Sequence, residues 1–299
     1  MEISELQVAQ KPSFSPGELE DAQALVRDAN WNQLPADWRL FLELGSVFTA
    51  QTGAGRVVAT AATLPFSQLA ASRDKAFAWI SMVLVTPEYR RRGIATVLMR
   101  RAMEELASRN LLPVLDATPD GRAVYRKLGF QDSWGFQRLI RREGAQAQAG
   151  VSAGAGVSIR SITDADWEDI CAYDAAAFGA DRSGVLGGLR GRLRAAELIA
   201  EREGRIAGFL VGRDGRVAAH IGPLIAEEDA IACALAERAV AALPRSVIID
   251  VADAKTALRD VLTSRGFTSV RPFTRMLHGT SRRLDDAERT FAVIGPEFG

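Results

Sequence analysis

The chain is short of the residues that hold metal ions and form disulfides. Its 299 residues include two cysteines, Cys171 and Cys233, and two histidines. The cysteines do not have the close spacing of a metal site, and two histidines are too few to complete a ligand set with them. We expect no metal and two buried, reduced thiols in a cytoplasmic protein, with a disulfide as the less favoured alternative.

The chain also lacks a net charge and a long apolar run. Its 37 Lys and Arg residues balance 37 Asp and Glu residues, which argues against a general attraction to nucleic acid or to an anionic membrane surface. No stretch is apolar enough to span a bilayer, and residues 1–16 lack the basic and then apolar order of a targeting signal. We expect a cytoplasmic protein with no nucleic-acid partner and no membrane partner.

A low-complexity segment divides the chain almost in half. Residues 144–156 are mostly Gly, Ala and Gln, which offer nothing to bury and predict a flexible linker. Hydrophobic residues make up 47% of the chain, enough for a core on each side of that segment. The predicted organisation is one domain over residues 1–143, the linker over 144–156, and a second domain with a C-terminal tail over 157–299.

Apolar periodicity predicts alternating helices and strands in both halves. In the first half it predicts helices at 19–29 and 36–44, strands at 46–51, 56–64 and 78–85, a helix after Gly93, a strand at 113–116, a helix at 121–128 and a strand at 136–141. In the second half it predicts strands at 198–203, 205–213 and 217–225, a helix at 229–243, a strand at 247–251 and a helix at 254–264.

The two halves end alike. Leu128-Gly129-Phe130 precedes Phe136-Gln137-Arg138, and Arg265-Gly266-Phe267 precedes Phe273-Thr274-Arg275 at the same separation. Asp116 and Asp250 close strands at equivalent places. Several matches in the same order favour an internal duplication.

The most informative stretch joins an apolar strand to an amphipathic helix through a basic turn. Backbone N–H groups at a helix N-terminus bind phosphate well. The small residues Gly93 and Ala95 let the backbone approach a ligand, and the arginines of the turn add positive charge. The pattern predicts a pyrophosphate site.

Two motifs in the first half resemble those of the GCN5-related N-acetyltransferase (GNAT) family. Arg90-Arg91-Arg92-Gly93-Ile94-Ala95 fits the family's Gln/Arg-x-x-Gly-x-Gly/Ala signature for acetyl-CoA, and Tyr125-Arg126-Lys127-Leu128-Gly129-Phe130 fits its Tyr-x-x-x-Gly-Phe ending. The resemblance implies an α/β (α+β) fold of two tandem GNAT-like domains, each with a mixed, mostly antiparallel central sheet flanked by helices. The second domain has lost the cofactor turn.

The resemblance also implies an activity and a set of cofactor contacts. The activity is transfer of an acetyl group from acetyl-CoA to a primary amine of a small molecule or protein, by direct attack in a ternary complex. The implied CoA-binding residues are Val83, Val85, Arg90, Arg91, Arg92, Gly93, Ile94, Ala95, Thr96 and Tyr125.

Three of these residues have more specific expected roles, one in binding pantetheine and two in catalysis. Val85 is expected to pair with pantetheine as an added strand would, and the N–H of Val83 to stabilise the oxyanion, a contribution of about 2.7–4 kcal/mol where such donors have been removed. Tyr125 is the expected general acid, with packing as its alternative role. The counterpart of Tyr125 in the second half is Leu262, which cannot donate a proton, so we expect no catalysis there.

The general base is less evident. Many relatives carry a glutamate where this chain has Trp79. Strand alternation predicts Trp79, Ser81, Val83 and Val85 on one face, without a carboxylate. Asp116 is the nearest expected base, acting through water or Ser81, and capping of the loop that follows it is an equal alternative.

The acceptor site is predicted only in outline. The expected acceptor-binding residues are Trp38, Trp79, Ser81 and Asp116, and core packing explains the tryptophans equally well. The apolar tail at 291–299 is expected to dock on a surface, and the second half to cover the acceptor side or support the first.

Two other functions compete with acetyl transfer. A non-catalytic acyl-CoA-binding sensor is the main alternative, while a basic-turn nucleic-acid module is disfavoured by the zero net charge. The sequence leaves a homodimer open and does not identify the acceptor.

Overall fold

The computed structural model describes residues 6–69, 76–144 and 152–299. Residues 145–151, most of the expected linker, lie outside the described residues, as do 1–5 and 70–75. None of the helices in the described part combines the length and apolar character that crossing a membrane requires.

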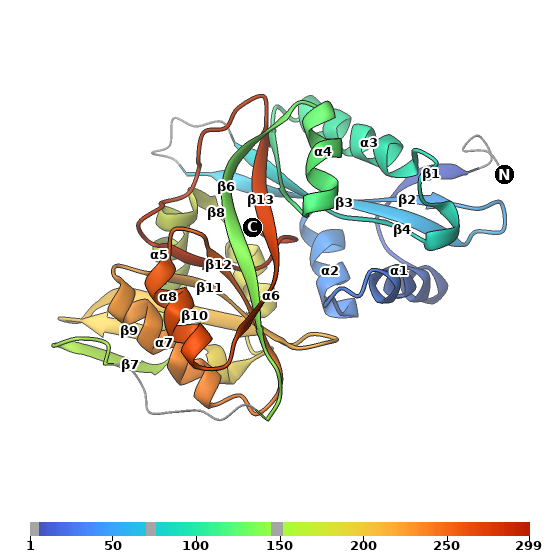
Figure 1. Ribbon diagram of the computed structural model, residues 1–299. Coiled ribbons are helices and arrows are strands. Elements are labelled where there is room, and N and C mark those ends of the chain that lie inside the picture. Colours follow the sequence, from blue (N-terminus) through green and yellow to red (C-terminus); the bar gives the residue numbers. More distant parts are fainter. Residues whose placement is uncertain (1–5, 70–75, 145–151) are drawn as a thin grey trace.

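The first half begins with a short strand and two helices that share one face of the sheet. Its elements are β1 (Gln7–Lys11), α1 (Pro16–Asp28), α2 (Pro35–Leu44), β2 (Ser46–Gln51), β3 (Val57–Gln68), β4 (Phe77–Val85), the 3-10 turn η2 (Pro87–Tyr89), α3 (Ile94–Ser108), β5 (Leu112–Ala117), α4 (Pro119–Lys127) and β6 (Phe130–Arg141). Helices α3 and α4 lie on the opposite face from α1 and α2 (Figure 1).

The second half repeats this order from β9 onward. Its elements are β7 (Val157–Ser161), η3 (Asp164–Asp166), α5 (Trp167–Phe178), β8 (Ala180–Asp181), α6 (Ser183–Leu189), η4 (Arg194–Ala196), β9 (Leu198–Arg202), β10 (Arg205–Arg213), β11 (Ala219–Ala226), α7 (Asp229–Ala241), β12 (Val247–Ala252), α8 (Thr256–Ser264), β13 (Thr268–His278) and β14 (Thr290–Val293).

The halves share one sheet because each gives a strand to the other. The main order is β1-β2-β3-β4-β5-β13-β6-β12-β14-β11-β10-β9-β7, and β8 pairs with β3. Strand β13 of the second half pairs with β5, and β6 of the first half pairs with β12. The exchanged strands pair with each other in the middle, where they run side by side in Figure 1. The sheet is mixed and mostly antiparallel, as expected, with β4–β5 and β11–β12 as parallel pairs.

The largest hydrophobic core lies between the halves. It joins residues of α1 and α2 to residues of α5, α6 and the tail, including Phe41, Phe178 and Phe298. Helix α6 was missed by the periodicity analysis because it contains three glycines, which are poor helix formers. Two of them allow close packing on α2, since a Cβ at Gly188 would lie 2.1 Å from Leu40 Cδ2 and one at Gly184 would lie 3.1 Å from Leu44 Cδ2.

Other elements were missed for a different reason. Strands β1 and β14 are only 5 and 4 residues long, and α5 has apolar residues around most of its circumference. Short or uniformly apolar segments give weak periodic signals.

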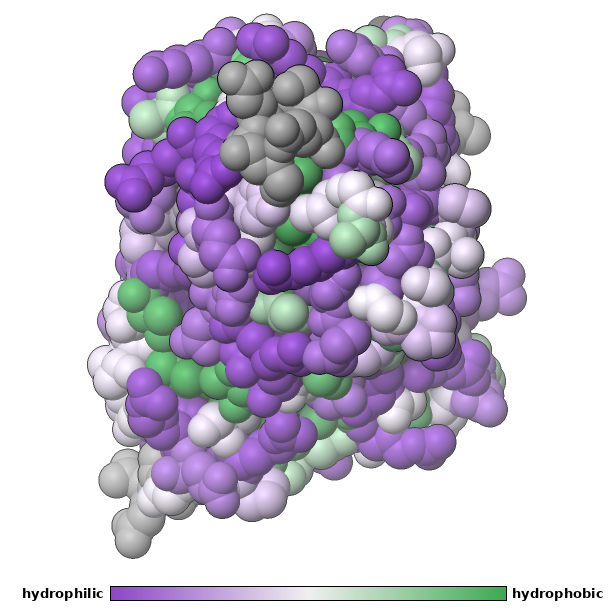
Figure 2. All heavy atoms as spheres, turned by 90° about the vertical axis from the view of Figure 1, so that its right-hand side faces the viewer, coloured by the Kyte–Doolittle hydropathy of each residue, from purple (hydrophilic) through white to green (hydrophobic). Residues whose placement is uncertain are grey.

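On the face shown in Figure 2, hydrophilic residues of the described part predominate and hydrophobic ones appear in small separate areas.

Candidate active site

The basic turn adopts the conformation that an anion site needs. Arg91 and Gly93 both have left-handed backbones, with φ of 60° and 84°. Gly93 is the N-cap of α3 and supplies no side-chain cap, and no acidic residue lies in the first turn. The first N–H groups of this helix therefore have no cap from a side chain and are available to an anion.

The arginines of the turn are exposed and make contacts that shape it. Arg90 Nε donates to the carbonyl oxygen of Val85 at 3.0 Å, and Arg92 Nη2 donates to the carbonyl oxygen of Glu88 at 2.7 Å. Arg92 also lies over the ring of Tyr89. Arg90 and Arg91 line the cavity described below and Arg92 does not, so Arg92 reinforces the turn from outside.

Strand β4 contains a bulge that changes which side chains share a face. Met82 has a φ of 52°, and the pairing with β3 shifts register between Thr60 and Ala62. The carbonyl oxygen of Met82 accepts a bond of 2.8 Å from Thr60 Oγ1. Trp79 consequently packs in the core between the halves, whereas Val83 and Val85 pack on the α3 side. The expectation that these residues share one face was wrong, because a bulge inserts an extra residue and reverses the alternation.

A cavity of about 550 Å³ begins at this turn and runs along β4. It is lined by backbone and side chains from β4, the turn, α3, β5 and α4, together with residues of both exchanged strands and the tail. These include Ser81, Val83, Val85, Arg90, Arg91, Gly93, Ile94, Ala95, Thr96, Asp116, Tyr125, Arg138, Arg271, Phe273, Pro296 and Glu297. The structure thus brings together all the expected CoA-binding residues except Arg92.

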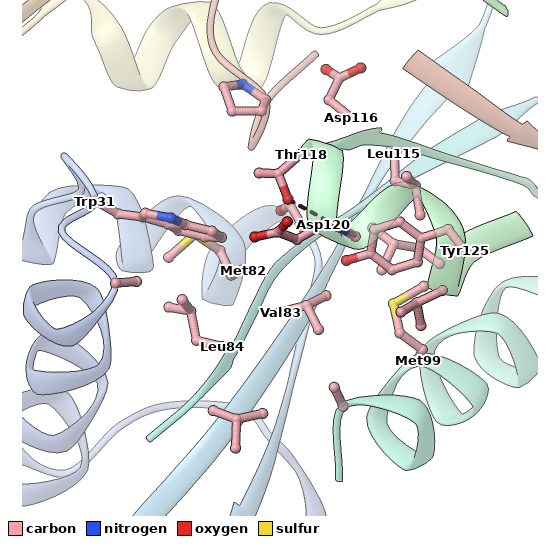
Figure 3. Close-up of a pocket in the computed structure, with 18 of the residues that line it drawn as sticks. Trp31, Met82, Val83, Leu84, Met99, Leu115, Asp116, Thr118, Asp120 and Tyr125 are labelled. Carbon is pink, nitrogen blue, oxygen red and sulfur yellow. Dashed lines mark hydrogen bonds between the residues drawn. The ribbon is translucent and has the colours of Figure 1, made fainter. Parts of the chain in front are cut away.

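Tyr125 lies on α4 with its ring edge-on to Phe130 and its hydroxyl directed toward the space beside Val83 (Figure 3). Helix α4 starts at a cap in which Thr118 Oγ1 accepts from the N–H of Gly121 at 3.3 Å. Gly121 must stay small, since a Cβ there would lie 2.9 Å from the Tyr125 ring. Burial raises the pKa of Tyr125 to about 12, so its phenol is neutral and able to donate a proton at neutral pH.

Asp116 is held by a partner that the sequence did not reveal. Its Oδ1 and Oδ2 accept from Arg275 Nε and Nη2 on β13, each at 2.9 Å. The guanidinium of Arg275 lies over the rings of Trp79 and Trp134. Burial raises the pKa of Asp116 above its usual range, although the guanidinium of Arg275 opposes the shift. In Figure 3 the Asp116 carboxylate points away from Tyr125 and Val83. The two bonds from Arg275 favour a structural role for Asp116 over that of the base, and Thr118 rather than Asp116 caps α4.

The remaining expected acceptor residues divide into two groups. Trp38 and Trp79 are buried in the core and do not line the cavity. Trp79 Nε1 instead donates to the carbonyl oxygen of Pro296 at 3.2 Å, which fixes the tail. Ser81 does line the cavity, and its buried hydroxyl has no hydrogen-bond partner among the described residues.

Several cavity residues escaped the sequence analysis. Arg138, Arg271 and Glu297 come from β6, β13 and the tail, all remote in sequence from the turn. The repeat offered one signal, because it aligned Arg138 with Arg275 and Asp250 with Asp116. The structure pairs Arg138 with Asp250 at 2.8 and 2.7 Å, as it pairs Arg275 with Asp116.

Comparisons with known proteins agree with this architecture. The family model described as "Acetyltransferase (GNAT) family" matches residues 4–130, and the one described as "Acetyltransferase (GNAT) domain" matches residues 170–292. The uncharacterized N-acetyltransferase YitH of Bacillus subtilis is 24% identical over 229 residues, which cover 77% of each protein.

Solved structures show the same fold over nearly the whole chain. A putative acetyltransferase from Pyrococcus horikoshii has a TM-score of 0.74 and 21% identity, and the match covers 98% of this chain and 96% of that one. A tandem GNAT protein from the clavulanic acid biosynthesis pathway has a TM-score of 0.62 and 15% identity, covering 91% of this chain and 98% of that one. With one GNAT model on each half and a whole-chain likeness to a tandem GNAT structure, this chain belongs to the GCN5-related N-acetyltransferase family as a tandem member.

Proposed function

We propose that the first half transfers an acetyl group from acetyl-CoA to a primary amine, by direct attack in a ternary complex. The observation that carries the proposal is one cavity that joins an uncapped helix N-terminus to the neutral phenol of Tyr125. Acetyl-CoA supplies the activated thioester. The amides near Arg91, Gly93, Ala95 and Thr96 would hold its pyrophosphate, and β4 around Val85 would hold its pantetheine arm.

The residues of this chain then have defined tasks. The amine nitrogen forms a bond to the acetyl carbon, the carbon–sulfur bond breaks, and the amine loses one proton. The N–H of Val83 would donate to the carbonyl oxygen while that oxygen carries negative charge. Tyr125 would give its proton to the departing sulfur and regain one from solvent.

Because the two free cysteines need no oxidising compartment, we propose that the reaction takes place in the cytoplasm.

Two measurements on the purified chain test this proposal. Calorimetry should detect acetyl-CoA binding, and release of free CoA thiol should depend on an added amine from a panel of small amines and lysine peptides. Absence of binding would refute the proposal. Binding without turnover on any acceptor would replace it with the acyl-CoA-binding sensor.

A further inference from the structure

Several residues that line the cavity carry buried polar atoms without a protein partner among the described residues. Four residues that line the cavity each carry a buried side-chain atom without a hydrogen-bond partner in the described part of the chain: Gln33 Oε1, Ser81 Oγ, Arg271 Nε and Glu297 Oε2. Leaving buried polar groups unpaired costs free energy. Their concentration in one cavity indicates that a polar ligand completes these hydrogen bonds.

Glu297 lines the cavity and carries a buried carboxylate oxygen, Oε2, without a hydrogen-bond partner in the described part of the chain. The residue is 2% exposed, and its Oε1 is held by Arg213, which also pairs with Asp37 at 3.2 Å. The tail that carries Glu297 is fixed by Trp79, and a Cβ at Gly295 would lie 2.8 Å from Glu297 Oε2. The second oxygen is therefore held in place without a partner, as an acceptor for a cation should be.

Arg271 supplies the opposite charge. It is half-buried with its guanidinium over the Phe273 ring, and it forms no ion pair with a carboxylate in the described part of the chain. Burial lowers the pKa of Arg271 and the nearby Arg138 lowers it further, while Asp250 and Glu297 act in the opposite direction without reversing the shift. Arg138 itself is committed to Asp250. Because no described carboxylate contacts the half-buried guanidinium of Arg271 directly, its N–H groups favour an anionic ligand.

We propose that Glu297 and Arg271 form the acceptor subsite for a small molecule carrying both a primary amine and a carboxylate, as an amino acid does. The ammonium would donate to Glu297 Oε2, with Ser81 Oγ and Gln33 Oε1 available to its other N–H groups, and the carboxylate would pair with Arg271. Glu297 would take the first proton, which the ammonium must lose before its lone pair can attack, and the second proton, lost once the carbon–nitrogen bond has formed, would pass to solvent. This inference rests on the proposed acetyl transfer and narrows its acceptor.

The first test compares matched acceptors and needs no mutation. Each α-amino acid is paired with its own amide, which keeps the amine and side chain but removes the negative charge. We expect kcat/KM to be roughly 10- to 100-fold higher for the best amino acid than for its amide, the usual range for a lost charged hydrogen bond. Equal rates for acid and amide would overturn the proposal.

The second test removes the two charges separately. Arg271→Gln should raise KM for the amino acid roughly 10- to 100-fold and leave KM for its amide and for acetyl-CoA within about twofold. Glu297→Gln should lower kcat for both acceptors. The matched controls are Arg205→Gln and Glu203→Gln, whose side chains are 83% and 81% exposed, and both should behave as wild type. If Arg271→Gln instead raised KM for acetyl-CoA alone, Arg271 would belong to the donor site and the proposal would fail.

A third measurement separates this inference from the proposed function. If CoA binds but no amine is acetylated, the acetyl transfer proposal fails, and calorimetry of amino acids and their amides on the CoA-loaded protein still tests the subsite. Preferential binding of amino acids, lost in Arg271→Gln, would support it, and equal or absent binding of both would refute it. Thermal melting of each variant shows whether Glu297→Gln remains folded.

Discussion

In each half two parallel strands separate after a few paired residues, and the gap between them is occupied differently in the two halves. Strands β4 and β5 pair at three positions, from Phe77 with Leu112 to Trp79 with Val114, and β11 and β12 also pair at three, from Ala219 with Val247 to Ile221 with Ile249. Beyond these positions both pairs separate. In the first half the space belongs to the cavity, whereas in the second half β14 enters it and pairs with both strands.

The filled opening makes the second half a support for the first. From β14 the chain continues to Pro296 and Glu297 at the cavity, and Phe298 stacks on Phe41 with ring centroids 5.0 Å apart. The strand opening of the second half thus holds a segment that leads into the cavity of the first half. This arrangement builds the cavity from residues of both halves.

A substitution in the basic turn tests whether only the first half binds acetyl-CoA. Gly93→Asp should weaken acetyl-CoA binding by about 100-fold or more, because it places a negative charge where phosphate should bind and strains a residue with φ of 84°. Calorimetry should show one site per chain in the wild type and none in the variant.

Gly55→Asp is the matched control for this variant. Gly55 has the same φ of 84° and open space around its Cβ position, but lies on the loop between β2 and β3. It should bind acetyl-CoA as the wild type does. One residual site in Gly93→Asp would show that the second half also binds the donor, and the contrast between the halves would be wrong.

Removing either of the two buried Asp–Arg ion pairs should lower the stability of the protein. Asp116→Asn and Asp250→Asn should each lower the free energy of unfolding by about 3–5 kcal/mol, since each leaves a buried arginine without its partner. Denaturant unfolding measures both, with the exposed Asp260→Asn as control.

The same pair of variants tests the role of Asp116. Because Asp250 holds the equivalent position in the half whose opening is filled, similar losses would identify both bridges as supports for the exchanged strands. The Asp116→Leu/Arg275→Met double variant should recover much of the lost stability and retain activity. A loss of kcat specific to the Asp116 variants would restore that residue as the base.

The sequence predicted features that depend on neighbouring residues and missed contacts between residues far apart in the chain. The turn at Arg90 to Ala95 and the helix after it depend on neighbouring residues, so their motif predicted them well. The partner of Asp116 lies 159 positions away and Glu297 lies 84 positions from Arg213. No local pattern encodes those distances. The bulge at Met82 was missed because it reverses an alternation without any glycine to mark it.

Tyr125→Phe tests proton donation from α4, a role that the equivalent helix α8 of the second half cannot fill. The variant should lower kcat by about 100-fold through loss of the proton donor, with KM for acetyl-CoA within about twofold. In the second half the counterpart Leu262 is buried in the core. Tyr173→Phe is the matched control, because burial also raises the pKa of Tyr173 to about 12 although it lies in the other half. A wild-type rate for Tyr125→Phe would remove the acid from the mechanism.

The smallest expected effect is on the pH profile of kcat. The neutral phenol is the form that donates, and burial raises the pKa of Tyr125 from about 10 to about 12. The competent form therefore persists to higher pH, and kcat should show no decline up to about pH 10, where a phenol with an ordinary pKa would be half ionised and the rate about twofold lower. The Tyr125→Phe profile provides the reference for titration of the amine itself. A decline near pH 10 that Tyr125→Phe abolishes would mean that the phenol has an ordinary pKa. Tyr125 would then be exposed to solvent in the working enzyme and not buried between α4 and β4.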